Sequence, residues 1–174
     1  MTVSNASAQR NLAWWVWTLP VVFAVHDGEE IVTMTAFLQS HADRLPAQLL
    51  KFTTNSTGQF VISVLFLLAL ILGFCILAKH SNYSGAPMTL FALLTAILFG
   101  NGLTHLGQAA ILRDYTPGVI TAPLVIVFTI LALRSFWENG FITRRSLLPM
   151  LVGGFLLQIP LVVVALAFGR IFSM

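Results

Sequence analysis

The residues best suited to chemistry in this sequence form one pentapeptide, HDGEE, at positions 26–30. It brings a histidine and three carboxylates together directly after residues 12–25, which carry no charge. Ionisable side chains at membrane depth are costly, and they are kept mainly where they pair, line a cavity or act in a function. The pentapeptide is therefore the leading candidate for a functional site.

Helical spacing sorts these side chains into two groups. His26, Glu29 and Glu30 stand at i, i+3 and i+4, which is one face of a helix. Thr33 extends that face by one turn, whereas Asp27 is turned roughly 100° away from it. Carboxylates this close repel one another unless a cation or a proton resides among them. Glu29 and Glu30 are themselves about 100° apart, so we expect one to face a bound metal and the other to face water or substrate.

The composition is that of a membrane protein, because hydrophobic residues make up 57% of the 174-residue chain and charged residues only 9%. A soluble domain carries about 25% charged residues. About 20 helical residues are needed to cross a hydrocarbon core, and five stretches reach that length. We therefore expect a single integral membrane domain over residues 1–174, an all-α transmembrane helical bundle. The five expected spans are residues 11–38, 57–79, 87–112, 117–137 and 147–172.

The third expected span carries a second polar face. Asn101, His105 and Gln108 stand at i, i+4 and i+7, and neighbouring glycines leave room for another helix or a ligand. The first and third spans run in the same direction through the membrane. At about 1.5 Å per residue, Glu30 and His105 each lie roughly 27 to 29 Å along their spans, so the two polar faces are expected to meet at one depth.

Two imidazoles and a carboxylate at one depth form a donor set for a divalent metal ion. We expect His26, Glu30 and His105 to be the metal ligands. Asn101 and Gln108 are expected to be supporting polar groups beside them. Nitrogen and carboxylate ligands of this kind suit zinc, iron or manganese.

Glu29 and Glu30 are the expected catalytic residues. In this interpretation Glu30 binds the metal, while Glu29 acts as general base or acid toward a water molecule on it. A competing interpretation needs no metal, since protonated His26 and His105 would neutralise the glutamates and only pin two helices together. No zinc-protease H-E-x-x-H motif, nucleophile elbow or nucleotide-binding glycine loop occurs in the chain.

The connection that follows the third span is the expected mouth of the site. Tyr115, Pro117, Gly118 and Thr121 are predicted there as groups that position a substrate. Pro117 suits the first turn of a helix, and the free amides at such a helix start would bind an anionic head group. An ordinary capped turn would use the same residues, so both interpretations stay open.

These motifs resemble those of a family of small bacterial membrane proteins that is named for its H-x-x-E-E motif. The family's first signature corresponds to residues 26–30, and its second, Gly-Asn-x-x-x-His, to residues 100–105. The second signature continues into Tyr-Thr-Pro-Gly at 115–118 and Thr-Ala at 121–122, with Thr116 where the family has asparagine. The resemblance covers most of the chain. It implies a membrane location and these site residues, but no reaction, because the family has no settled activity.

We favour a metal-dependent membrane enzyme that acts on a membrane lipid or another lipophilic small molecule, with hydrolysis, isomerisation and oxidation all open. A cation- or proton-coupled transporter is the second hypothesis, and a homo-oligomer would complete its pore. A structural membrane protein with an internal His/Glu ion network is the third. Nucleic acid is not an expected partner, because the basic residues are dispersed along the membrane flanks.

The distribution of basic residues also gives an expected orientation. Five Lys and Arg residues flank the face of the expected bundle that holds the N-terminus, against four on the other face, which favours a cytoplasmic N-terminus. The expected location is the bacterial cell membrane. A short segment, residues 46–52, is expected to lie along the membrane interface.

Overall fold

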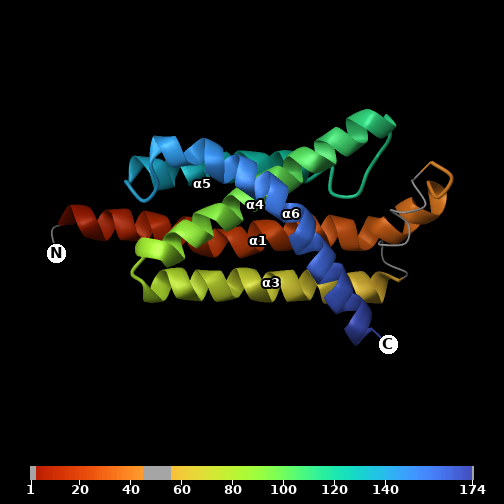
Figure 1. The fold of residues 1–174 in the computed structure, drawn as a ribbon, viewed down its shortest axis with the longest axis horizontal. Coiled ribbons are helices and arrows are strands. Elements are labelled where there is room, and N and C mark those ends of the chain that lie inside the picture. The colour runs from red at the N-terminus through yellow and green to blue at the C-terminus, as the bar shows by residue number, and fades with distance from the viewer. Residues whose placement is uncertain (1–2, 45–55, 174) are drawn as a thin grey trace.

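Helices make up nearly all of the structure, a computed structural model that describes residues 3–44 and 56–173 (Figure 1). The helices are α1 (Val3–Ser40), α3 (Thr57–His80), α4 (Gly85–Leu112), α5 (Ala122–Glu138) and α6 (Arg144–Phe172). No strand occurs within the described ranges, so the prediction of an all-α helical bundle is confirmed. The segment 46–52, expected at the membrane interface, lies outside the described residues.

Most helices follow the expected spans closely, but α1 begins at Val3, eight residues before the expected span, and a correction is needed at the start of α5. That helix begins at Ala122, five residues after the expected start at Pro117. Residues 117–121 form turns instead, and Gly118 has a φ of +84°, which a right-handed helix excludes. Pro123 then occupies the first turn of α5, where its missing N–H costs no helical hydrogen bond.

Three of the helices, α3, α4 and α6, are long and apolar enough to cross a membrane. In α3 and α6 only 22% and 17% of the most apolar stretch is buried inside the bundle, so large hydrophobic side chains cover its outer surface. Such a surface fits a lipid environment. Helix α1 carries the acidic pentapeptide and α5 is only 17 residues long, and whether these two also span the membrane stays a prediction.

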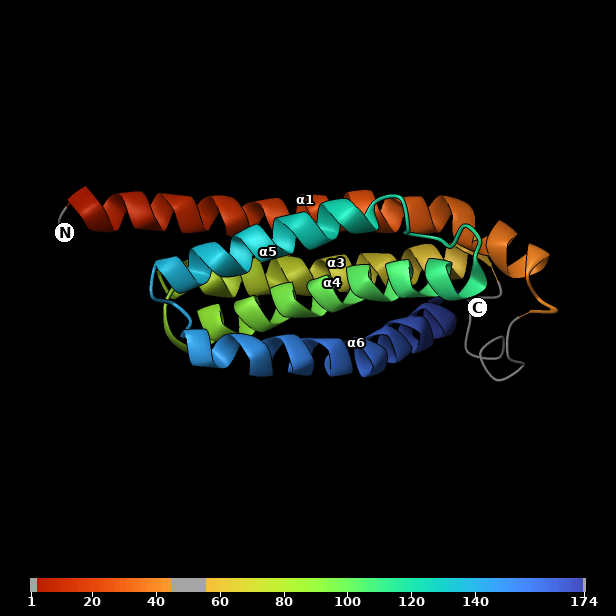
Figure 2. The same cartoon turned by 90° about the horizontal axis from the view of Figure 1, so that it is seen from above.

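The helices pack so that α1 and α6 lie on opposite sides of the bundle (Figure 2). Helix α1 packs against α3 and α5, whereas α6 crosses α4 and α3. Helix α4 runs between them, in the same direction as α1, and contacts every other helix of the bundle. This arrangement sets the polar face of α4 beside that of α1, at the same level along the bundle.

A glycine fixes the contact between α4 and α6. A Cβ atom on Gly154 would lie 2.6 Å from the carbonyl carbon of Ala96, so the two backbones touch at this point. Small residues allow such close helix contacts in membrane bundles. Gln158, one turn further along α6, is thereby brought against Thr104 of α4.

Pro20 leaves a backbone acceptor open inside α1, and α3 satisfies it. Proline has no N–H, so the carbonyl of Val16, four residues earlier, receives no helical hydrogen bond. The thiol of Cys75 on α3 donates to this carbonyl at 3.3 Å, and both residues are fully buried. The contact ties α1 to α3 about three turns before the pentapeptide.

Candidate metal centre

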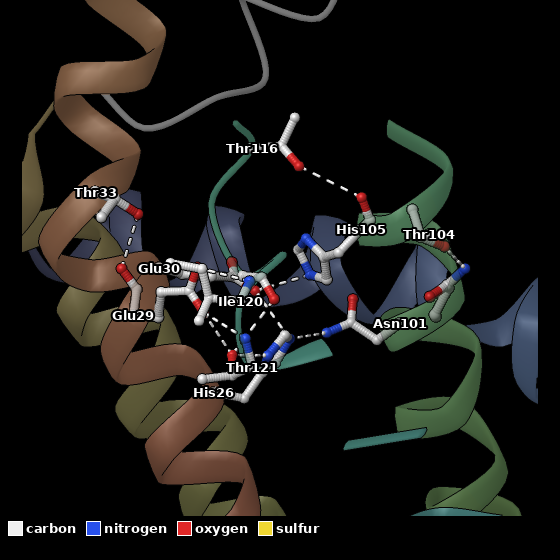
Figure 3. A network of polar contacts seen from close by, with 12 residues as sticks. His26, Glu29, Glu30, Thr33, Asn101, Thr104, His105, Thr116, Ile120 and Thr121 are labelled. Atoms are coloured by element: carbon white, nitrogen blue, oxygen red, sulfur yellow. Dashed lines mark hydrogen bonds and ion pairs between the residues drawn. The ribbon is translucent and has the colours of Figure 1, made fainter. Parts of the chain in front are cut away.

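Three predicted ligands converge between α1 and α4. One ligand atom each from His26, Glu30 and His105 can be chosen so that all three lie within 4.8 Å of one another, and all three residues are buried. Glu30 Oε1 lies 3.4 Å from His26 Nε2 and 2.9 Å from His105 Nε2 (Figure 3). The predicted meeting of the two polar faces is therefore confirmed.

These distances suit a small divalent ion. Metal–ligand bonds of about 2.0–2.1 Å in a tetrahedral site put neighbouring donor atoms about 3.4 Å apart. The Glu30–His26 separation already has this value, and the Glu30–His105 pair would open by a few tenths of an ångström. The three chosen ligand atoms lie within 4.8 Å of one another, so the two imidazoles would have to draw closer around a bound ion.

The neighbours of His26 determine which of its ring nitrogens carries the proton in the neutral ring. Thr121 Oγ1 lies 2.7 Å from Glu29 Oε2 and 2.7 Å from His26 Nδ1. A hydroxyl has one proton, and the carboxylate can only accept it, so Nδ1 of His26 must be the donor toward Thr121. In the neutral ring Nε2 then carries a lone pair, which faces Glu30 and accepts a 3.1 Å hydrogen bond from the Asn101 amide. This is the tautomer that a metal ligand bonded through Nε2 requires.

His105 has no comparable partners. Both of its ring nitrogens are buried without a hydrogen bond, although Nε2 lies 2.9 Å from Glu30 Oε1. The two atoms are thus within ion-pair distance, but the angle between them is unsuitable for a hydrogen bond. An unsatisfied buried polar group costs about 1–3 kcal/mol, which a bound cation between the two side chains would recover.

Gly118 closes the site from the loop side. A Cβ atom at this position would lie 2.9 Å from His105 Nδ1 and 3.0 Å from His26 Cε1. The two imidazoles are themselves in edge contact, with ring centroids 4.8 Å apart. Both the positive φ and the lack of space therefore require glycine here.

Glu29 has a separate environment from Glu30. Its Oε1 accepts from the Tyr115 hydroxyl at 2.8 Å and from the Ile120 amide at 3.2 Å. Its Oε2 accepts from the amide and the hydroxyl of Thr121, at 2.8 and 2.7 Å. The two glutamates differ in environment as expected, but Glu29 faces the loop at 115–121 and not open water, and the division into metal ligand and catalytic group stays a prediction. The backbone amides expected to bind an anionic head group instead bind this carboxylate.

Tyr115 is held as a donor in this loop. Burial, together with the neighbouring Glu29 carboxylate, raises the pKa of the Tyr115 phenol above its ordinary value. The hydroxyl thus keeps its proton at neutral pH and donates it to Glu29. Ligand binding by Tyr115 stays a prediction.

Two cavities adjoin the cluster, and both reach Glu30 and Asn101. One, of about 540 Å³, is also lined by His105 and by the predicted residues Gln108 and Pro117. The other, of about 440 Å³, has mostly apolar walls from α3, α4 and α6. Both volumes lie in the range of about 300–1,000 Å³ that is usual for small-molecule sites.

Sequence reasoning missed two residues that line the 440 Å³ cavity, Asp27 and Gln158. Asp27 is not among the predicted site residues because it points away from the helix face that carries His26. Gln158 is an isolated amide within the apolar part of α6, and that isolation is the one signal that could have singled it out.

The comparisons with known proteins place these residues in one family. A family described as "Protein of unknown function with HXXEE motif" matches residues 17–133, about two thirds of the chain. The matched region contains the whole His26, Glu30 and His105 cluster and the loop that closes it, whereas α6 lies beyond it. No curated protein and no solved structure matches the chain.

Proposed function

Because the chain belongs to the HXXEE-motif family, whose function is unknown, we propose from its site that it is a metal-dependent membrane enzyme acting on a lipophilic or lipid-linked substrate. The observation that carries this proposal is the buried convergence of His26, Glu30 and His105. Two imidazoles and a carboxylate suit zinc, iron or manganese. The ring nitrogens of His105, neither of which has a hydrogen bond in the described residues, support a bound cation over a fully hydrogen-bonded ion network.

The surroundings of His26 support the same conclusion. In many metal sites the ligating imidazole donates its other N–H to a carboxylate, directly or through a bridging group, which fixes the ring and makes it more basic. Thr121 and Glu29 form such a chain behind His26. Glu29 is then a positioning residue that acts through Thr121.

The cavities support a lipophilic substrate. Their walls are mostly apolar, and Glu30 and Asn101 lie where the two cavities meet. An alkyl chain would bury its surface among these side chains, while its polar end would reach the metal. A metal supplies a Lewis acid and lowers the pKa of a bound water, which serves hydrolysis, isomerisation or oxidation alike.

A cation- or proton-coupled transporter is the second candidate. It is favoured by one observation, the position of Glu30 where the two cavities meet. Ion uptake into proteoliposomes, coupled to a solute and lost in Glu30→Gln, would support this candidate over the enzyme.

The test is the metal content of protein purified in mild detergent without chelator. We expect about one zinc, iron or manganese ion per chain, and at least a tenfold loss in His105→Ala and Glu30→Gln. His80→Ala is the matched control, because His80 is an exposed histidine at the C-terminal end of α3. A wild-type protein that takes up none of the three metals, even after reloading, would overturn the proposal and leave the ion network. Metal-dependent mass changes in a lipid extract incubated with the loaded protein would then identify the reaction.

A further inference from the structure

The 440 Å³ cavity contains polar groups that the metal centre does not use. It lies between α1, α3, α4 and α6 and is walled mainly by leucine, isoleucine, valine and phenylalanine side chains. The polar exceptions are Asp27, Glu30, Ser63, Asn101 and Gln158. What these groups offer to a ligand depends on which of their atoms are already hydrogen-bonded.

Three of them are engaged. Glu30 lies against both histidines, and Asn101 donates to His26. Ser63 donates its hydroxyl proton to the backbone carbonyl of Gln59 at 3.1 Å. These three side chains therefore leave the recognition of a new ligand to Asp27 and Gln158.

Asp27 presents an oxygen without a partner. Only 5% of the residue is exposed, and its Oδ2 atom is buried without a hydrogen-bond partner in the described part of the chain. A carboxyl oxygen in an apolar cavity needs a hydrogen-bond partner, and the described residues around it supply none.

Gln158 presents an acceptor, and its orientation is fixed. The Thr104 hydroxyl donates its one proton to the Gly100 carbonyl at 3.0 Å, so it can only accept from Gln158. The amide nitrogen of Gln158 therefore points to Thr104, at 2.8 Å, and its Oε1 atom is the free one. Gln158 is 6% exposed, and Oε1 has no partner among the described residues.

We propose that this cavity binds a single-chain amphiphile whose head group forms a hydrogen bond with Asp27 Oδ2 and donates one to Gln158 Oε1. The alkyl chain lies among the apolar side chains of α3, α4 and α6. A vicinal diol and a primary ammonium share this donor chemistry, whereas ethers and quaternary ammonium heads lack it. This inference rests on the proposed function in one respect: the ligand is taken to be the substrate, and the cavity places its head group near Glu30.

The experiment compares pairs of probes with the same alkyl chain. In each pair one head group has hydrogen-bond donors, and in the other methyl groups replace them. Protein in phosphatidylcholine nanodiscs, whose lipid head has no donor, is titrated with 1,2-dodecanediol and with its dimethyl ether. A second pair is dodecylamine and dodecyltrimethylammonium, which share a charge. Apparent dissociation constants come from the rise of the thermal unfolding midpoint with probe concentration, and empty nanodiscs correct for partitioning.

We expect at least one donor-bearing probe to bind about tenfold more tightly than its donor-free partner, as a charge-assisted hydrogen bond allows. The preferred pair then identifies the head as neutral or cationic. This preference should be lost in Asp27→Leu and in Gln158→Met and kept in Gln108→Met, whose residue lines the other cavity. If Asp27→Leu does not fold, Gln158→Met decides alone.

Absence of a preference in the wild type, or its persistence in both variants, would overturn the inference. Metal content measured on the same preparations separates this outcome from failure of the proposed function. Asp27→Leu and Gln158→Met should keep their metal, since neither residue belongs to the His26, Glu30 and His105 group.

Discussion

Two adjacent glutamates of one motif have opposite environments. Glu29 accepts four hydrogen bonds from the loop at 115–121, which occupy both of its oxygens. Glu30 Oε1 lies 3.4 and 2.9 Å from the two imidazole nitrogens, which is at or below the donor spacing of a metal site. One of those imidazoles, that of His105, has no hydrogen bond within the described residues. A carboxylate saturated with donors serves structure, whereas one set among unsatisfied nitrogens is ready to bind a cation.

The difference arises from the loop rather than from the helix. The two glutamates are consecutive residues of α1. The turn through Gly118 directs the Ile120 and Thr121 amides only at Glu29. The same turn places Gly118 on the imidazoles. One short connection therefore both anchors Glu29 and closes the site around Glu30.

The largest effect is expected from Gly118→Ala, which attacks both glutamate environments at once. The left-handed φ and the contact with two imidazoles together should cost about 3 kcal/mol of unfolding free energy. Metal binding should fall by at least tenfold, because His26 and His105 must move. Unfolding by sodium dodecyl sulfate and metal titration measure the two quantities.

Gly140→Ala is the matched control for that variant. Gly140 also has a positive φ, +76°, but a Cβ atom there would meet nothing within 4 Å. Its unfolding free energy should fall by only about 1–2 kcal/mol, which is the strain of the left-handed φ, and its metal binding should be unchanged. Equal losses in the two variants would show that the imidazole contact has no effect.

A smaller effect is expected from Glu29→Gln. The new NH₂ group must replace one of the two oxygens and so face two of the four donors, which should cost about 2 kcal/mol of unfolding free energy. Metal should still bind at saturation, about tenfold more weakly, because the chain that orients His26 is disturbed. Glu30→Gln should lose the metal itself. Equal metal loss in the two variants, measured by metal titration, would remove the division between the glutamates.

The smallest effect is expected at Asp114, an exposed second attachment of the same loop. The hydrogen bond from His41, followed by that from the Tyr115 amide, lowers the pKa of Asp114 below its ordinary value. Such a carboxylate adds stability above its unfolded pKa of about 3.9 and loses it as the pH falls through the lower folded value. Wild type should therefore unfold about 1 °C above Asp114→Asn at pH 6 and lose this advantage progressively as the pH falls below about 3.9.

Salt provides the control for this exposed attachment. Arg44 also contacts Asp114, at 3.3 Å, and 1 M salt screens exposed ion pairs. The difference between wild type and variant should shrink in 1 M salt at pH 6. An advantage that is constant from pH 3 to pH 6 would mean that the Asp114 charge contributes nothing.

The sequence predicts the parts of the site that depend on helix geometry. His26 and Glu30 share a face because they are one turn apart, and His105 meets them because α4 runs parallel to α1 at matching depth. These relations follow from rise and rotation per residue. Periodicity fixes them before any contact between helices is known.

The partners of Glu29 and Gln158 could not be predicted in that way. The start of α5 depends on a turn whose amides are drawn to Glu29, a residue 91 positions from Ile120. Gln158 lies in the cavity because Gly154 lets α6 touch α4, and many other rotations of α6 have equal hydrophobic patterns. Long-range contacts decide both features, and local sequence does not contain them.

The sulfur–carbonyl contact between Cys75 and Val16 gives the molecule a natural reporter. The thiol is fully buried as long as α1 and α3 stay together, and it is the only cysteine in the chain. A motion that lifts α1 from α3 at Val16 would expose this sulfur. The rate at which a membrane-permeant maleimide labels the protein would therefore time the opening of the bundle, without any engineered label.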